Sequence, residues 1–112
     1  MNFGLLKRDI RNIVQAASQF PEIQEVLVFG SRAKNTFQKG SDVDLAIKGK
    51  GVNAETANRL RSQLNEERPL PYFFDVVSYD DITNRELREH IDRVGQRIFD
   101  ARSAGTYTSN QG

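Results

Sequence analysis

The sequence predicts an α+β domain in which helices pack on a small β-sheet. Three segments place apolar residues at the three- and four-residue spacing of an amphipathic helix. Three shorter runs are rich in β-branched and aromatic residues, as strands are. Proline, glycine and polar residues separate these segments, and a chain of 112 residues suits one domain rather than two.

The chain is expected to begin with a helix over residues 4–19 and a buried strand over residues 26–29. The helix follows from apolar residues at helical spacing, which are Leu6, Ile10, Ile13, Val14 and Ala17. It should end before Pro21, because the residue that precedes a proline is driven out of the α region. Ser31 can then act as the N-cap of a brief helix or turn over residues 33–37.

The rest of the chain is expected to add two strands and two helices. A loop, NTFQKGS, leads to a strand over residues 42–48, and a helix over residues 54–67 stops at Pro69. A third strand, YFFDVVS, is followed by a last helix from Arg85 to about Arg102. Its apolar stripe consists of Leu87, Ile91, Val94 and Ile98. Residues 1–102 would form the domain, and the polar residues 103–112 a disordered tail.

Composition excludes several classes of function. Sixteen Lys and Arg against fifteen Asp and Glu give a net charge of +1, so no broad field attracts nucleic acid or a membrane. The absence of cysteine excludes disulfides and thiolate chemistry, and a single histidine excludes a multi-histidine metal site. The first residues lack the apolar region of a signal peptide, and no run is long enough to span a membrane. We therefore expect a cytoplasmic protein.

Three carboxylates lie in or beside the expected strands. Asp42 and Asp44 are two residues apart and share one face, and Asp75 interrupts the apolar run FFDVV, where an unpartnered charge is costly. The turn formed by Gly30 and Ser31 follows directly on the first strand, where N–H groups and a hydroxyl can face an anion. If the three strands are neighbours, these groups meet at one edge of the sheet.

This set of ligands predicts a metal site. Oxygen ligands without Cys or His suit Mg²⁺ or Mn²⁺. Two such ions, about 4 Å apart, could assist an in-line phosphoryl displacement. Each part alone has an ordinary explanation: a plain turn, a solvated strand start, or a strand carboxylate paired with an arginine. The compatible order of the parts along the chain favours the metal site.

Four further residues carry weaker signals. Arg32, Lys34 and Lys39 flank the Gly-Ser turn and could neutralise a triphosphate, although each could equally be a solvated surface residue. His90 lies on a charged helical face and is interpreted as an ordinary surface residue.

The segment FGSRAKNTFQKGSDVDLAI resembles the hG[GS]…[DE]h[DE]h signature of the DNA polymerase β-like nucleotidyltransferase superfamily. The chain looks most like the minimal, MntA-like nucleotidyltransferases, from about Val26 to Asp100. The resemblance implies an α+β nucleotidyltransferase fold with a small mixed sheet. It also implies transfer of a nucleoside monophosphate from a nucleoside triphosphate, most simply AMP from ATP, with pyrophosphate as the leaving group.

The resemblance assigns roles to individual residues. Gly30 and Ser31 would hold the β- and γ-phosphates, with Arg32 and Lys39 as further nucleotide-binding residues. It implies that the catalytic residues, which are also the ligands of two Mg²⁺ ions, are Asp42, Asp44 and Asp75. Asp42 and Asp44 would bind both ions, and Asp75 would bind the catalytic ion and help to take the proton of the acceptor. Asn35 stands where many relatives have glycine. This departure bears on the geometry of the loop and little on the binding of the metals.

The resemblance also suggests a partner. Minimal relatives are often antitoxins that pair with a HEPN-domain RNase and adenylylate a tyrosine on it, so we expect a helical HEPN-domain partner. The alternatives are the catalytic subunit of an aminoglycoside-type nucleotidyltransferase, a non-catalytic module that neutralises a partner by covering it, and a nucleotide or metal sensor.

Overall fold

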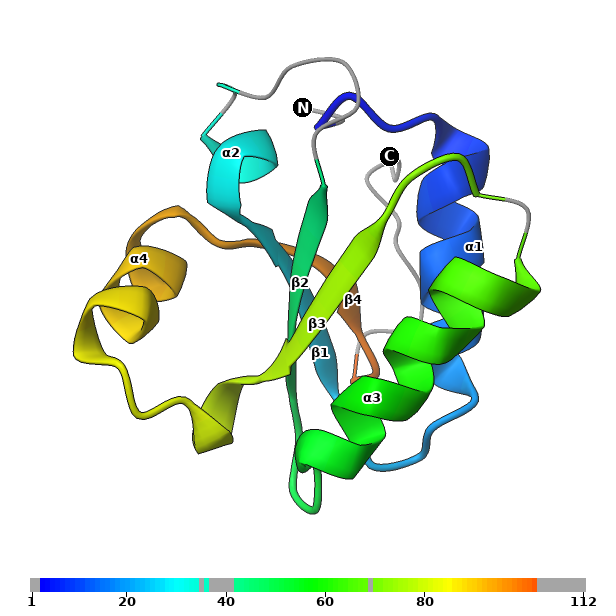
Figure 1. Cartoon of the computed structure of the whole chain (residues 1–112). Helices are drawn as coiled ribbons and strands as arrows, with labels where there is room; N and C mark the ends of the chain where they lie inside the picture. Colours follow the sequence, from blue (N-terminus) through cyan, green and yellow to red (C-terminus); the bar gives the residue numbers. More distant parts are fainter. Residues whose placement is uncertain (1–2, 35, 37–41, 69, 103–112) are drawn as a thin grey trace.

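The structure, a computed structural model, describes residues 3–34, 36, 42–68 and 70–102. The elements are α1 Lys7–Ser18, β1 Glu25–Phe29, α2 Gly30–Ala33, β2 Val43–Lys48, α3 Ala54–Ser62, β3 Phe74–Ser78, α4 Arg85–Val94 and β4 Gln96–Asp100. Figure 1 shows α1 and α3 on one side of a central sheet and α4 on the other. No helix in the described ranges has both the length and the apolar character needed to cross a membrane.

The four strands form one mixed sheet in the order β3-β2-β1-β4. β1 is antiparallel to both β2 and β4, whereas β2 and β3 are parallel and are joined by α3. The predicted α+β fold with a small mixed sheet is therefore confirmed, and the three predicted strands are neighbours. The ladders place the end of β1 beside the beginnings of β2 and β3.

The two faces of the sheet pack differently. The larger core lies between the sheet and the pair α1 and α3, and it contains Val43, Leu45 and Ile47 of β2. The smaller core contains Ala46 of β2 and Ile91 of α4. Because strand side chains alternate between faces, the residues of β2 that point toward the α4 side are the even-numbered ones.

Asparagine side chains cap the N-termini of two helices, α3 and α4. Asn53 Oδ1 accepts a hydrogen bond of 3.0 Å from the N–H of Thr56 at the start of α3. Asn84 Oδ1 accepts one of 2.9 Å from the N–H of Leu87 at the start of α4. Such N-caps satisfy donors that have no partner within the helix. After Ser62 the helix continues as a π-helical turn over Gln63–Glu67, so the predicted extent of this segment is right.

The predicted single helix from Arg85 to about Arg102 is wrong. α4 ends at Val94, and Gln96–Asp100 forms β4, which pairs with β1. Gly95 explains the break, since a Cβ at this position would lie 2.5 Å from the Ile91 carbonyl oxygen and 3.3 Å from the Leu27 side chain. The strand buries Ile98 on the sheet, and this burial together with the ladder hydrogen bonds outweighs local helix propensity.

The expected role of Ser31 as an N-cap is also wrong. α2 begins at Gly30 and its N-cap is Phe29, two residues before the predicted N-cap, so Ser31 lies inside the helix. The left-handed backbone of Gly30, with φ of 74°, turns the chain directly from β1 into α2. Of the predicted loop over residues 35–41, only Thr36 is described, and the predicted tail over residues 103–112 lies outside the described residues.

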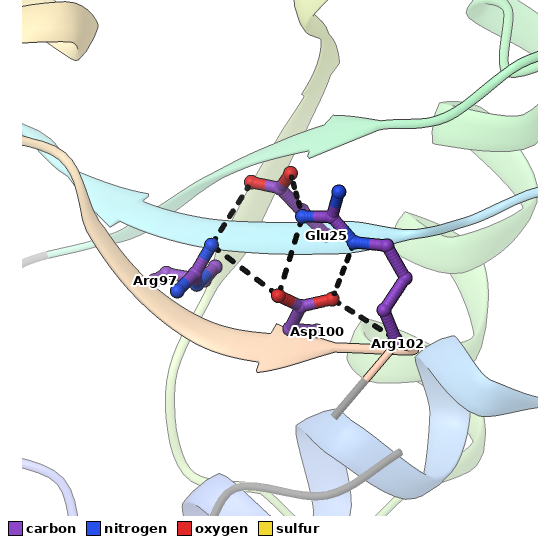
Figure 2. Close-up of polar contacts among 4 residues, drawn as sticks. All are labelled: Glu25, Arg97, Asp100 and Arg102. Atoms are coloured by element: carbon purple, nitrogen blue, oxygen red, sulfur yellow. Dashed lines mark hydrogen bonds and ion pairs between the residues drawn. The ribbon is translucent and has the colours of Figure 1, made fainter. Parts of the chain in front are cut away.

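Four charged residues join β4 to the start of β1, as Figure 2 shows. Arg102 lies 3.2 Å from both Glu25 and Asp100, and Arg97 lies 3.3 Å from Asp100 and 4.0 Å from Glu25. The hydrogen bond from Arg102 lowers the pKa of Asp100. Both arginines are largely exposed, so each pair adds little stability. We interpret this cluster as structural, because it lies at the opposite end of β1 from Gly30.

Candidate active site

Asp44 and Asp75 lie directly opposite each other in the parallel ladder between β2 and β3. Alternation places them on the face of the sheet that also carries Ala46 and Val77, which is the α4 side. Asp44 is partly buried and Asp75 is exposed. Like charges at opposing positions repel each other, so the backbone ladder holds two carboxylates together against their repulsion.

The electrostatics of Asp44 show the effect of this repulsion. Its pKa is raised from 3.8 to about 6, first by burial and then by the charges of Asp75 and Asp42, while the charge of Arg32 opposes the rise. A carboxyl group in this setting is ionised at neutral pH only at a cost in free energy. A cation beside the carboxylates would remove that cost, and perturbed carboxylates of this kind cluster at functional sites.

Gly30 brings the predicted turn against this acidic pair. A Cβ at Gly30 would overlap the Oδ2 atom of Asp44, so the backbone of the turn and the carboxylate are in direct contact. Glycine is required twice here, for the space and for the left-handed backbone. Ser31 follows in the first turn of α2 and is partly buried. The structure thus brings together the turn and the strand carboxylates that the sequence singled out.

A profile of the family described as "Polymerase beta, Nucleotidyltransferase" matches residues 11–104. The chain belongs to this family. The match spans the acidic pair and the Gly-Ser turn, and nucleotidyltransferases of this superfamily generally use divalent metals. No curated protein sequence is significantly similar to the chain.

Solved structures agree with this family at the level of the fold. A toxin-antitoxin crystal structure with AMP-PNP has a TM-score of 0.64 at 20% identity, covering 83% of this chain and 72% of its own. One mutant of the toxin-antitoxin MntA-HpeT has a TM-score of 0.61 at 17% identity, with 83% and 71% covered. Another mutant of MntA-HpeT reaches 0.64 at 20% identity, with 86% and 73% covered. The predicted resemblance to the DNA polymerase β-like nucleotidyltransferase superfamily is confirmed by the family match, and these structures share its fold.

In this nucleotidyltransferase, Arg32 is buried and turned toward the N-terminal segment. Its Nη1 donates a hydrogen bond of 2.8 Å to the carbonyl oxygen of Phe3, and its guanidinium lies 5.1 Å from the centre of the Tyr72 ring. The Tyr72 hydroxyl in turn donates to the buried carboxylate of Asp9 at 2.9 Å. The charge of Arg32 acts on Asp44 from within the protein. Lys39, the other predicted cation, lies outside the described residues.

The interpretation of His90 as an ordinary surface residue is wrong. It is half-buried on α4, and its Nε2 accepts a hydrogen bond of 3.0 Å from the N–H of Gly30. Its ring meets the Phe29 ring edge to face, with 6.0 Å between centroids. The only feature of the sequence that could have drawn attention to His90 is that it is the single histidine of the chain. Its contact with Gly30 could not be predicted, because the two residues are 60 positions apart.

Asn65 is a second residue that sequence reasoning missed. Its side-chain amide donates to the Phe74 carbonyl oxygen at 2.9 Å and accepts from the Phe74 N–H at 2.8 Å. These bonds hold the edge of β3 one residue before Asp75. Asn65 lies in the π-helical turn after α3.

The carboxylates suit a hard divalent cation by their chemistry. Within the described residues, no three His, Cys, Asp or Glu side chains lie close enough together to hold a metal ion. Asp42 is exposed just before β2, while Asp44 and Asp75 face each other across the ladder. All three groups supply oxygen ligands, which Mg²⁺ and Mn²⁺ prefer. The raised pKa of Asp44 is the observation in favour of a cation, since burial and two neighbouring carboxylates outweigh the opposing charge of Arg32.

Proposed function

We propose that this nucleotidyltransferase moves AMP from ATP to a hydroxyl group of a helical partner protein and serves as the antitoxin of a HEPN/MNT toxin-antitoxin pair. The observation that carries the proposal is the contact between Gly30 and Asp44 at the point where Asp44 faces Asp75. This contact places a candidate phosphate-binding turn beside candidate metal ligands. Transfer of a nucleotide needs both.

The structural neighbours support the choice of nucleotide and partner. One of them is a toxin-antitoxin with AMP-PNP, an analogue of ATP, and two others are mutants of the toxin-antitoxin MntA-HpeT. The HEPN character of the partner rests on the resemblance of this chain to minimal nucleotidyltransferases.

In the proposed mechanism, Gly30 and Ser31 hold the β- and γ-phosphates. Asp42, Asp44 and Asp75 are the residues that would hold two Mg²⁺ ions, which when bound supply positive charge to the triphosphate. The acceptor oxygen forms a bond to the α-phosphorus. The bond between the α-phosphorus and the oxygen that bridges it to the β-phosphorus breaks, and pyrophosphate leaves. Asp75 is exposed on an edge strand, so an acceptor hydroxyl can approach it and pass its proton there.

The surface beside Asp75 offers one contact for a partner. The apolar stripe of the expected last helix cannot serve, because Ile98 is buried in β4. Among the described residues, the exposed large apolar side chains are Leu6 and Phe73, each 53% exposed. Phe73 lies two residues before Asp75. An aromatic anchor so close to the reacting group is suited to docking a protein acceptor.

The test uses the chain together with the product of a neighbouring HEPN-like gene. The two proteins are co-expressed and then incubated with labelled ATP and Mg²⁺, and the intact mass of the partner is measured. We expect the partner to gain AMP with the wild-type chain and with Asp80→Asn, an exposed carboxylate at the other end of β3. Asp42→Asn should give no gain, because it removes a metal ligand.

Other outcomes would favour the alternatives. A partner that never gains mass while the chain alone adenylylates an aminoglycoside would favour the antibiotic-modifying enzyme. A partner that is neutralised equally well by Asp42→Asn, again without a gain in mass, would favour the non-catalytic binding module.

A further inference from the structure

His90, on α4, contacts the turn formed by Gly30 and Ser31, although Gly30 lies 60 positions earlier in the sequence. It lies on α4 beside Ile91, whose side chain is 1% exposed and fixes the helix against the sheet. From there its Nε2 accepts the Gly30 N–H at 3.0 Å. The Phe29 ring, in edge-to-face contact, limits the orientation of the imidazole. The contact joins two elements that meet only through tertiary packing.

The imidazole takes the place of a helix cap. Gly30 is the first residue of α2, so its N–H has no partner within the helix. The N-cap residue is Phe29, whose side chain cannot accept a hydrogen bond. A side chain from another element accepts this bond instead, at the glycine that touches Asp44.

We propose that His90 is a positioning residue for nucleotide transfer, holding the Gly30 backbone against Asp44 so that the turn is preformed for the triphosphate. The inference rests on the proposed function. His90 does not contact the reacting atoms and acts through Gly30. Because a backbone N–H donates to Nε2, that nitrogen is unprotonated and the neutral ring carries its proton on Nδ1.

Burial and the charges around His90 favour the neutral imidazole. Burial lowers its pKa from 6.5, and so do the positive charges of Lys34, from the end of α2, and of Arg93, on α4 itself. The Phe29 ring contributes no charge. The Asp44 carboxylate approaches Gly30 where a Cβ would stand. Protonation at lower pH would place a donor against the donor of Gly30, so the hydrogen bond would break and the turn would be released.

Three variants test the inference by transfer kinetics. His90→Gln keeps an acceptor that does not titrate, His90→Phe keeps a ring against Phe29 without an acceptor, and Glu89→Gln is an exposed control on the same helix. At about pH 7.5, His90→Phe should lose roughly tenfold in kcat/KM for ATP, the equivalent of one hydrogen bond. His90→Gln and Glu89→Gln should keep most of the wild-type value.

The pH profile separates a positioning role from a purely structural one. Wild-type kcat/KM should fall toward about pH 5, and His90→Gln should lack the part of this fall that is due to imidazole. Protonation of the metal ligands also contributes to the fall, but that part moves to lower pH when the Mg²⁺ concentration is raised, since protons and metal compete. A fall that is identical in wild type and His90→Gln at high Mg²⁺ would overturn the inference.

An NMR titration provides a readout that does not depend on transfer. In the ¹⁵N-labelled chain without nucleotide, the Gly30 amide shift should follow the titration of the His90 imidazole. The part of the shift that persists in His90→Gln belongs to Asp44. A Gly30 amide that is unaffected by His90→Gln, or a folded His90→Phe with full kcat/KM, would refute the positioning role. If wild type transfers no nucleotide at all, the proposed function fails, while the titration still decides whether His90 holds Gly30.

Discussion

Replacing Asp44 by asparagine should stabilise the metal-free protein while abolishing its activity. The pKa of Asp44 is about 6 in the folded chain, against 3.8 as its ordinary value. The folded state therefore binds this proton more tightly than the unfolded state, and ionisation at neutral pH favours unfolding. Asparagine has the same shape and carries no charge, so the replacement removes this penalty.

The size of the effect follows from the pKa. The rise from 3.8 to about 6 corresponds to about 3 kcal/mol if fully expressed. Asp44 is only partly buried, and solvent screening should reduce the gain to about 1–2 kcal/mol. For a domain of this size, that gain raises Tm by roughly 5–10 °C. The gain should shrink as pH falls through 6 and disappear below 3.8, where wild-type Asp44 is protonated in both states.

The assay is urea denaturation of both proteins with EDTA, at several pH values from about 4 to 8. Asp80→Asn serves as the control carboxylate and should show no such gain. Added Mg²⁺ should then stabilise wild type more than Asp44→Asn, because binding to the folded state alone raises stability. The reasoning would be refuted if Asp44→Asn were less stable than wild type near neutral pH in EDTA, or if the difference did not change with pH.

Three further substitutions test other parts of the site. Gly30→Ala should lose transfer activity and about 1–3 kcal/mol of stability, because it strains a left-handed backbone and overlaps the Asp44 carboxylate; wild-type transfer would contradict this. Tyr72→Phe removes a hydrogen-bond donor from the buried Asp9 carboxylate and should lower the free energy of unfolding by about 1–3 kcal/mol; an unchanged urea midpoint would argue against that contribution. Asp75→Asn should still bind ATP by calorimetry while kcat collapses, because the Gly30 turn and Asp44 remain; lost binding with normal turnover at saturation would assign Asp75 a different role.

Most of the fold could be predicted because most elements carry local signals. The strands at the centre of the sheet are apolar, and the longer helices carry apolar stripes. Two of these helices, α3 and α4, also begin with asparagine caps. β4 was missed because Ile98 continues the helical spacing of Leu87, Ile91 and Val94. What decides its structure is not local: Gly95 has no room for a side chain, and the following residues pair with β1.

The candidate site was predictable where it depends on spacing along one strand or on a motif. The apolar context marked Asp75 as unusual. The shared face of Asp42 and Asp44 stays a prediction, because Asp42 lies just before the first residue of β2. His90 and Asn65 could not be found in this way, since their partners are backbone groups brought near by packing. The roles of Ser31, Arg32 and Lys39 toward a nucleotide stay predictions.

The bonds between Asn65 and Phe74 also bear on how the protein behaves at high concentration. An edge strand such as β3 presents backbone groups to which a second molecule can add its own strand, and sheets can grow between chains in this way. The side-chain amide of Asn65 already pairs with both the N–H and the carbonyl of Phe74. It imitates one residue of a neighbouring strand, so another chain cannot begin pairing at that position. The π-helical turn that carries Asn65 thus acts against self-association at the edge where we propose that the acceptor approaches Asp75.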